Sequence, residues 1–239
     1  MTLVGSSPTA SAREIPVFAK TLSGGVSELA KEPVLKTGGP EGPCGFESHR
    51  LRQPRTGLFF LGGENVRALL VIDLQRDFVD KDGALYFEGA EKVIDPVLKW
   101  VEEFKKENLP IITTQDWHDP EDREFSLWPK HCVANTDGAR LTEKLEKALE
   151  DYPNHFSVKK NRYSAFYNTN LEKVIRDNEI DEVYVCGVVT HICVLFTVEE
   201  LRNRDIPVKI ITEGVASYDE GLHRFALREM KEILGAELI

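Results

Sequence analysis

Short apolar runs alternate with amphipathic segments from about residue 66 to the end of the chain. Most of the runs are rich in Val and Ile and hold few polar residues, which is typical of strands that are buried on both faces of a parallel sheet. The sequence predicts five strands and a short sixth one, at residues 68–72, 110–114, 156–160, 182–186, 208–212 and 238–239.

The segments between these strands have helical periodicity. In the first of them, Val93, Val97, Val101 and Phe104 fall on one face, while Glu and Lys occupy the other face. Helices are predicted at residues 93–104, 141–149, 171–178, 194–201 and 222–234. Because strands and helices alternate, the expected fold is a three-layer α/β/α sandwich with a mostly parallel sheet.

Composition narrows the class of protein. With 239 residues, of which 41% are hydrophobic, the chain can bury one sizeable core. A formal charge of -10 argues against nucleic acid or an anionic membrane as the main partner. The four cysteines show no CxxC spacing, which favours a reducing compartment. No signal peptide and no membrane-spanning run are evident, so we expect a soluble, cytoplasmic protein.

Residues 1–65 differ from the remainder, because they are rich in Gly, Pro, Ser and Thr and have no sustained periodicity. They are expected to be an unstructured extension, and residues 66–239 the folded domain. Gly-Gly-Glu at 62–64 corresponds to a ribosome-binding site read as codons, and Val66 to a GTG start. Residues 43–52 also look like a translated transfer-RNA arm. Our hypothesis is that the annotated translation start lies too early and that the native protein begins near Val66.

Chemically distinctive side chains follow four of the predicted strands. Asp73 follows the first strand, Asp116 and His118 the second, Lys160 ends the third, and Cys193 lies shortly after the fourth. Because ligands bind beyond the carboxyl ends of parallel strands, these side chains are expected to meet at one edge of the sheet. One such residue would carry little weight, but four segments that deliver a carboxylate, a metal-type cluster, an ammonium and a thiol favour an active site.

Each candidate has a chemical and a structural interpretation. Cys193 is expected in the first turn of a helix, where the helix dipole favours a nucleophilic thiolate, but it could also be a small buried hydrophobe. Asp73 can act as a general base or cap a strand end, and Lys160 can stabilise an anion or lie at the surface. Backbone N–H groups of Val189 and Cys193 could bind an oxyanion.

A second cluster suits a divalent metal ion. Asp116-x-His118 and the nearby His131 provide a carboxylate and two imidazoles, a donor set that zinc accepts with positions left open. Cys132 is interpreted as a packing residue. Three aromatic residues lie close in sequence to the candidate catalytic and metal residues and could form the walls of a slot for a flat ring, although core filling is the usual role of such residues: Phe78, Trp128 and Tyr163.

These residues lie in motifs that resemble the isochorismatase-like cysteine hydrolases and, among them, the nicotinamidases. The motifs are V-I-D-L-Q-R-D-F (71–78), D-W-H (116–118), W-P-K-H-C (128–132), K-N-R-Y-S-A-F (160–166) and C-G-V-V-T-H-I-C-V (186–194). The resemblance runs from about Val66 to the C-terminus and includes E-G-V-A-S-Y-D (213–219). The D-x-H…H cluster points to the nicotinamidases.

The resemblance implies a role for each position. It makes Cys193 the nucleophile, Asp73 the general base and acid, and Lys160 the third catalytic residue. It implies a cis peptide bond between Val188 and Val189, with the Val189 N–H in the oxyanion hole. Metal ligands and ring walls are implied at further positions, with Glu124 as a fourth ligand: Asp116, His118, His131 and Glu124 for the metal; Phe78, Trp128 and Tyr163 for the ring. His191 departs from the pattern, because many relatives carry an acidic residue there.

The function implied is hydrolysis of nicotinamide to nicotinic acid and ammonia through a cysteine thioester, as a step in NAD salvage, with pyrazinamide as an alternative substrate. One divalent metal ion is implied, zinc first, with iron or manganese as alternatives, and a homo-oligomer is left open. Two other interpretations remain: a related hydrolase that acts on a different small substrate, and a non-catalytic protein that binds a metal or ligand.

Overall fold

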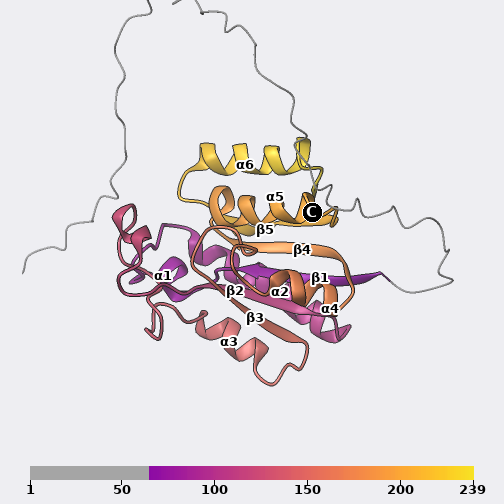
Figure 1. Cartoon of the computed structure of the whole chain (residues 1–239), viewed down its shortest axis with the longest axis horizontal. Coiled ribbons are helices and arrows are strands. Elements are labelled where there is room, and N and C mark those ends of the chain that lie inside the picture. Colours follow the sequence, from indigo (N-terminus) through magenta and orange to yellow (C-terminus); the bar gives the residue numbers. More distant parts are fainter. Residues whose placement is uncertain (1–64) are drawn as a thin grey trace, which may run out of the picture. The chain divides into compact units, whose positions relative to one another are not determined.

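The computed structural model describes residues 65–239, which form a six-stranded sheet with helices on both faces (Figure 1). All neighbouring strands are parallel, in the order β3-β2-β1-β4-β5-β6. The three-layer α/β/α sandwich is confirmed, and the sheet is parallel throughout rather than mostly parallel. The hypothesis about residues 1–65 falls almost wholly outside the described residues. The strands are β1 (Val66–Ile72), β2 (Ile111–Asp116), β3 (His155–Lys160), β4 (Ile180–Val188), β5 (Val208–Ala216) and β6 (Glu237–Leu238).

Two hydrophobic clusters, one on each face of the sheet, hold the helices in place. The first cluster contains the apolar sides of α2 (Ile94–Lys106) and α3 (Glu143–Leu149). The second contains those of α4 (Leu171–Asp177), α5 (Leu195–Arg202) and α6 (Glu220–Glu232). The short elements are α1 (Arg76–Val79) and the turns η1 (Ala90–Val93), η2 (Arg123–Ser126) and η3 (Thr190–Val194).

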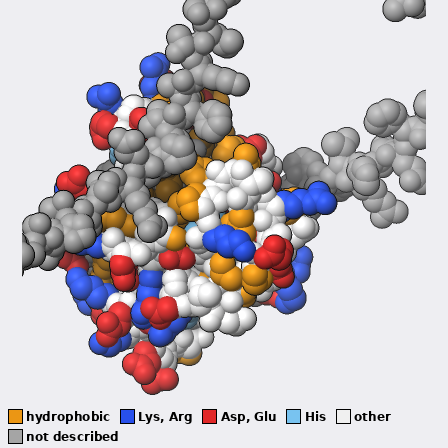
Figure 2. All heavy atoms as spheres, turned by 90° about the vertical axis from the view of Figure 1, so that its left-hand side faces the viewer, with side chains coloured by type: hydrophobic (Ala, Val, Ile, Leu, Met, Phe, Trp, Pro, Cys, Tyr) orange, Lys and Arg blue, Asp and Glu red, His pale blue; other side chains and the backbone are white. Residues whose placement is uncertain are grey.

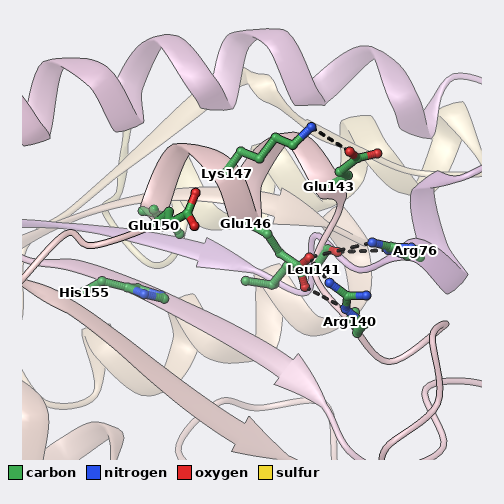
Figure 3. A pocket seen from close by; sticks show the side chains of 9 residues that line it. Arg76, Arg140, Leu141, Glu143, Glu146, Lys147, Glu150 and His155 are labelled. Carbon is green, nitrogen blue, oxygen red and sulfur yellow. Dashed lines mark hydrogen bonds and ion pairs between the residues drawn. The ribbon is translucent and has the colours of Figure 1, made fainter.

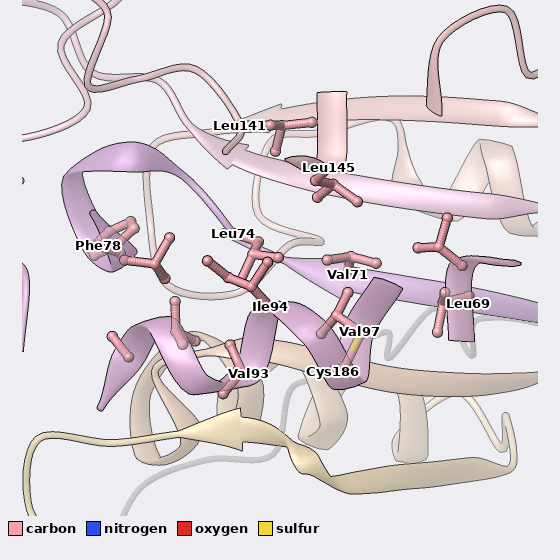
Figure 4. Packing of buried hydrophobic residues seen from close by; sticks show 14 of the residues in the cluster. Leu69, Val71, Leu74, Phe78, Val93, Ile94, Val97, Leu141, Leu145 and Cys186 are labelled. Atoms are coloured by element: carbon pink, nitrogen blue, oxygen red, sulfur yellow. The ribbon is translucent and has the colours of Figure 1, made fainter. Parts of the chain in front are cut away.

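The central position of β1 in the sheet explains why its sequence is an unbroken apolar run. Leu69 and Val71 belong to the first cluster, and Leu70 and Ile72 to the second, because successive side chains of a strand point to opposite faces. Figure 4 shows Leu69 and Val71 beside residues of the helices that cover the first face. A strand in the middle of the sheet therefore has no solvent-facing side, and both sets of positions must be apolar.

The topology places a crevice at one edge of the sheet. From β1 the chain passes to β2 and β3 on one side, and then to β4, β5 and β6 on the other side. The strand order therefore reverses between β1 and β4, and such a switch point is where ligands bind in open α/β sheets. Figure 2 shows the molecule from the edge near α1, where apolar side chains reach the surface between charged ones.

One glycine is required where β4 lies against β1. Gly187 has φ +112°, and a Cβ at this position would lie 1.9 Å from the Ile72 carbonyl oxygen. We expect Gly187→Ala to lower the free energy of unfolding by about 3 kcal/mol. Gly89 is a matched control, because its φ is +93° but the nearest atom would be 4.0 Å away; Gly89→Ala should cost about 1 kcal/mol. Equal losses of unfolding free energy in the two variants, measured by urea denaturation, would contradict the role of the close contact between position 187 and the Ile72 carbonyl oxygen.

Candidate active site and metal site

Asp73, Lys160 and Cys193 meet at the carboxyl edge of the sheet, although they come from three separate segments. The Lys160 ammonium lies 2.7 Å from Asp73 Oδ2 and 3.5 Å from Cys193 Sγ. All three residues are buried. A carboxylate oxygen of Asp73 and the thiol sulfur lie within 4.8 Å of each other. The structure thus brings together the three residues that the sequence singled out for catalysis.

Asp73 is held by a residue that the sequence did not indicate. The Thr114 hydroxyl donates a 2.6 Å hydrogen bond to Asp73 Oδ1 and accepts one from the Asp73 backbone N–H at 3.1 Å. Thr114 lies on β2, next to β1 in the sheet, and Asp73 follows β1 with φ 49°. Asp73 Oδ2 lies 2.7 Å from the Lys160 ammonium and pairs with it by charge. A carboxylate oxygen of Asp73 also lies within 4.8 Å of the Cys193 sulfur, so this carboxylate can accept the thiol proton.

The electrostatics of the site favour a neutral thiol beside a charged pair. Burial raises the pKa of the Asp73 carboxyl to about 6, although the nearby Lys160 opposes the shift. Burial alone would lower the pKa of Lys160, but Asp116 and Asp73 raise it well above its usual value. Burial also raises the pKa of the Cys193 thiol. Lys160 lowers this pKa, whereas Asp73 and Asp116 raise it further. At neutral pH the resting site then holds a thiol, an ionised Asp73 and a charged Lys160.

This protonation state differs from the expectation that the helix dipole favours a thiolate at Cys193. Cys193 lies in the π-helical turn η3 rather than in the first turn of an α-helix, and the Val194 N–H donates to the Val189 carbonyl at 3.3 Å. Burial and the nearby carboxylates of Asp73 and Asp116 raise the pKa of this thiol. The thiol therefore needs a base in order to react.

The turn before Cys193 has the backbone that the resemblance implies. The Val188–Val189 peptide bond is cis. Val189 is buried and lines the same cavity as Cys193, and its N–H has no hydrogen-bond acceptor among residues 65–239. His191 does not line this cavity, because its ring contacts Ser217 Oγ at 2.8 Å and the Tyr218 hydroxyl at 3.2 Å.

Asp116, His118 and His131 form a compact group whose ligand atoms lie within 4.8 Å of one another. Asp116 Oδ2 is 3.9 Å from Nε2 of each histidine, and Asp116 Oδ1 contacts the Lys160 ammonium. Backbone hydrogen bonds join the segment that carries His118 to the segment that follows His131. The His118 N–H donates to the Cys132 carbonyl at 3.0 Å, and the Ala134 N–H donates to the His118 carbonyl at 2.9 Å. Asp116 therefore belongs to both the metal group and the catalytic group.

The donor atoms fit a divalent metal ion. His118 Nε2 is buried and has no hydrogen-bond partner within the described part of the chain. His131 Nδ1 lies 2.8 Å from the Pro129 carbonyl oxygen and must donate to it, which leaves the lone pair on Nε2. Two imidazole nitrogens and one carboxylate suit zinc, iron or manganese. An orphaned buried nitrogen beside a carboxylate is the arrangement expected of a metal site.

Glu124 stands apart from this group. It is buried and lines the cavity, but it is not one of the residues whose ligand atoms cluster within 4.8 Å. Instead, its Oε2 lies 3.6 Å from Arg162 Nη1. Cys132 is also buried, and its N–H donates to Asp77 Oδ2 at 2.6 Å, as suits a packing residue.

The three aromatic residues singled out in the sequence line one cavity with Cys193. Its volume is about 30 Å³, which is below the usual range for small-molecule sites. The Trp128 indole N–H donates to the Tyr163 hydroxyl at 3.2 Å, and the Phe78 ring lies 5.7 Å from the His131 ring. Several further residues complete the lining, of which only some were singled out from the sequence: Leu85, Asp116, Glu124, His131, Val189 and Ile192.

A larger hollow lies elsewhere, beside α3 (Figure 3). Its basic side chains are paired with acidic neighbours, for example Arg76 with Asp137 at 2.8 Å and Lys147 with Glu143 at 2.7 Å. None of the candidate catalytic or metal residues lines it. The smaller cavity at the switch point is therefore the candidate active site.

The chain is similar to several known proteins. The family model of the isochorismatase domain matches residues 67–239. The crystal structure of the nicotinamidase PncA from Bacillus subtilis is 32% identical, with a TM-score of 0.69, covering 72% of this chain and 98% of that one. The pyrazinamidase of Pyrococcus horikoshii in complex with zinc is 32% identical, with a TM-score of 0.66, covering 72% and 98%. A relative from Arabidopsis thaliana, described as a probable inactive nicotinamidase, is 28% identical over 70% of this chain and 88% of its own length.

None of the helices in residues 65–239 is long and apolar enough to cross a membrane.

Proposed function

Because this chain belongs to the isochorismatase family of hydrolases, we propose that it converts nicotinamide into nicotinic acid and ammonia, as a step in NAD salvage. The observation that carries the proposal is the contact of the Cys193 thiol, the Asp73 carboxyl group and the buried Lys160 ammonium beside a metal-type donor set. Amide hydrolysis needs a nucleophile, a proton carrier and charge stabilisation, and these groups supply all three.

In the first half of the reaction, Asp73 takes the proton of the Cys193 thiol, and the sulfur attacks the carboxamide carbon. The carbonyl oxygen becomes an oxyanion, for which the N–H groups of Val189 and Cys193 are the proposed donors. Asp73 then gives the proton to the departing nitrogen, the C–N bond breaks, and ammonia leaves a thioester on Cys193. Lys160 keeps Asp73 charged at the start, because it compensates the carboxylate at 2.7 Å.

In the second half, a water molecule gives a proton to Asp73 and attacks the thioester carbon. The C–S bond breaks, the sulfur recovers the proton from Asp73, and nicotinic acid leaves. One water is consumed and one ammonia is released for each amide, and the side chains return to their starting protonation states. Asp73 therefore acts as a base and as an acid in each half.

The substrate is oriented by the cavity and the metal group. Phe78, Trp128 and Tyr163, which line the cavity beside Cys193, are proposed to flank the pyridine ring. Asp116, His118 and His131 would hold the ion, and Glu124 is the candidate for a fourth contact. When bound, a divalent ion supplies a Lewis-acidic partner for the pyridine nitrogen.

A panel of three amides tests the substrate assignment. Nicotinamide and pyrazinamide have a ring nitrogen that can face the metal group, whereas benzamide has the same shape without it. We expect the full-length, zinc-loaded protein to hydrolyse the first two and to show a kcat/KM at least about tenfold lower for benzamide, since one lost polar contact typically costs about 1.4 kcal/mol or more. Hydrolysis of a different small amide, with none of nicotinamide, would overturn the substrate and leave the thiol chemistry in place.

The acid limb of the pH profile should report Asp73. Because only the ionised carboxylate can take the thiol proton, and its pKa is raised to about 6, we expect kcat/KM to fall about tenfold per pH unit below that value. Thr114→Val removes a hydrogen bond that stabilises the ionised form. The pKa should then rise further and the acid limb should move to higher pH. An acid limb that stays unchanged in Thr114→Val would contradict the assignment of the base.

A further inference from the structure

We propose that Asp122 and Arg162 are positioning residues of the metal site, and that they fix His118 so that its Nε2 lone pair faces Asp116. The inference rests on the metal group of the proposed function. Neither residue touches the proposed substrate, because neither lines the cavity that holds Cys193. Their effect would therefore act through His118 and the loops that carry the ligands.

The two ring nitrogens of His118 have different surroundings, because only Nδ1 lies within hydrogen-bond distance of a carboxylate. Nδ1 lies 3.2 Å from Asp122 Oδ2, while Nε2 lies 3.9 Å from Asp116 Oδ2 and has no hydrogen-bond partner within residues 65–239. A neutral imidazole carries one proton, and a carboxylate at Nδ1 holds that proton there. The lone pair is then on Nε2, the nitrogen that belongs to the metal group.

Asp122 is itself held in place by the protein. Its side chain is only 6% exposed. Oδ1 accepts the Glu124 backbone N–H at 2.9 Å, and Arg162 Nη1 lies 3.1 Å from each carboxylate oxygen. Donors from two different loops therefore set the orientation of the carboxylate before any ion binds. A ligand whose supporting group is fixed in this way loses little freedom on binding a metal.

Arg162 connects this support to the catalytic lysine. Its backbone carbonyl accepts a hydrogen bond from Lys160 Nζ at 3.1 Å, while its guanidinium pairs with Asp122. The same guanidinium nitrogen lies 3.6 Å from Glu124 Oε2. One residue in the loop after β3 thus contacts the lysine beside Cys193 and the carboxylate behind His118.

Metal affinity provides the test, measured on full-length apo-protein by competition with a chromogenic chelator for Zn²⁺. We expect Asp122→Ala to weaken Zn²⁺ binding by about 10- to 100-fold, the usual effect of losing such a support. Asp122→Asn should weaken it less, because the amide oxygen can still accept the Nδ1 proton. Asp119→Asn is the matched control, since Asp119 is exposed and follows His118 directly, and within residues 65–239 its side chain contacts only the Glu121 N–H, at 2.9 Å. It should bind Zn²⁺ as the wild type does.

Arg162 offers a second, graded comparison. Because a single guanidinium nitrogen makes both contacts with Asp122, a lysine ammonium can take its place. Arg162→Lys should therefore keep most of the Zn²⁺ affinity, whereas Arg162→Gln should lose several-fold. The visible absorption of bound Co²⁺ should change in Asp122→Ala and Arg162→Gln and stay unchanged in Asp119→Asn, because it reports ligand geometry.

Turnover of nicotinamide by the wild type is measured separately, so that the two proposals can fail independently. Wild-type affinity in Asp122→Ala, or no Zn²⁺ binding by the wild type, would overturn the positioning role. If the wild type hydrolysed no nicotinamide while Asp122→Ala still lost Zn²⁺ affinity, the support would stand and the proposed activity would fall. If Asp122→Ala does not fold, the test uses Asp122→Asn, provided that its circular dichroism spectrum matches that of the wild type. Equal Zn²⁺ affinities of Asp122→Asn and Asp119→Asn would then contradict the proposal.

Discussion

Replacement of Cys193 by alanine is expected to lower kcat/KM for nicotinamide by at least about 10⁴-fold, the scale on which enzymes lose rate without their nucleophile. Asp73 and Lys160 would remain, but no thioester could form. The substitution removes one sulfur atom from a buried position, so the fold should persist. The measurement is initial-rate ammonia release by wild type and Cys193→Ala at equal zinc content.

Cys186 provides the matched control, because it is also a buried thiol but packs in the hydrophobic cluster on the opposite face from the one to which Cys193 belongs. Cys186→Ala should keep turnover within a few-fold, with a loss of stability. Nicotinamide binding to Cys193→Ala, measured by calorimetry, separates an enzyme from a binding protein. Bound nicotinamide with lost turnover supports the enzyme, whereas unchanged slow turnover in both proteins would contradict a role for the thiol.

Lys160→Met is expected to have the second large effect, on stability as well as on activity. The fully buried ammonium compensates Asp73 at 2.7 Å and also contacts Asp116. Its loss leaves two buried carboxylates without a cation, which typically costs about 3–5 kcal/mol. The pKa of Asp73 should then rise further, because the opposing charge is gone. A protonated Asp73 cannot accept the thiol proton, and turnover at neutral pH should fall about 10³-fold.

The adjacent lysine shows whether this effect depends on position. Lys159 points to the other side of β3, is exposed, and places its ammonium 3.5 Å from the centre of the Trp117 ring. Lys159→Met should cost no more than about 1 kcal/mol and leave turnover unchanged. Thermal unfolding and ammonia release of both variants make the comparison. Similar losses in the two would show that lysine charge in general, rather than the buried contact, is what matters.

The sequence was sufficient to predict the layers of the fold and to place the candidate residues at one edge of the sheet. Apolar runs such as residues 68–72 identify strands of a parallel sheet, and the rule for carboxyl ends then places Asp73, Asp116 and Lys160 at one edge. The structure brings these residues together with Cys193. The boundaries were less accurate: β2 continues to Asp116 and β5 to Ala216, beyond the apolar parts of the strands.

Contacts between neighbouring strands and loops could not be predicted in this way. In the sequence, Thr114 is one more β-branched residue of a predicted strand. Only the pairing of β2 with β1 shows that its hydroxyl donates a hydrogen bond to Asp73. Asp122 and Arg162 lie in polar segments far apart in the chain, so the sequence does not indicate that their side chains form an ion pair. The one signal that could have indicated Asp122 is its position four residues after a candidate ligand histidine.

The surroundings that set the pKa of the Cys193 thiol could not be predicted from its local sequence. The sequence shows only the local helix, whose dipole lowers the pKa of a thiol at its N-terminus. The burial of the sulfur and the two carboxylates that face it come from other strands, and together they raise that pKa.

The most direct test of the central claim is ammonia release from nicotinamide by the full-length, zinc-loaded protein, with nicotinic acid measured in the same samples. We predict equal amounts of the two products, loss of the reaction on prolonged treatment with a chelator, and recovery when zinc is restored. A folded, zinc-loaded protein that releases neither product would contradict the assignment of nicotinamide as the substrate.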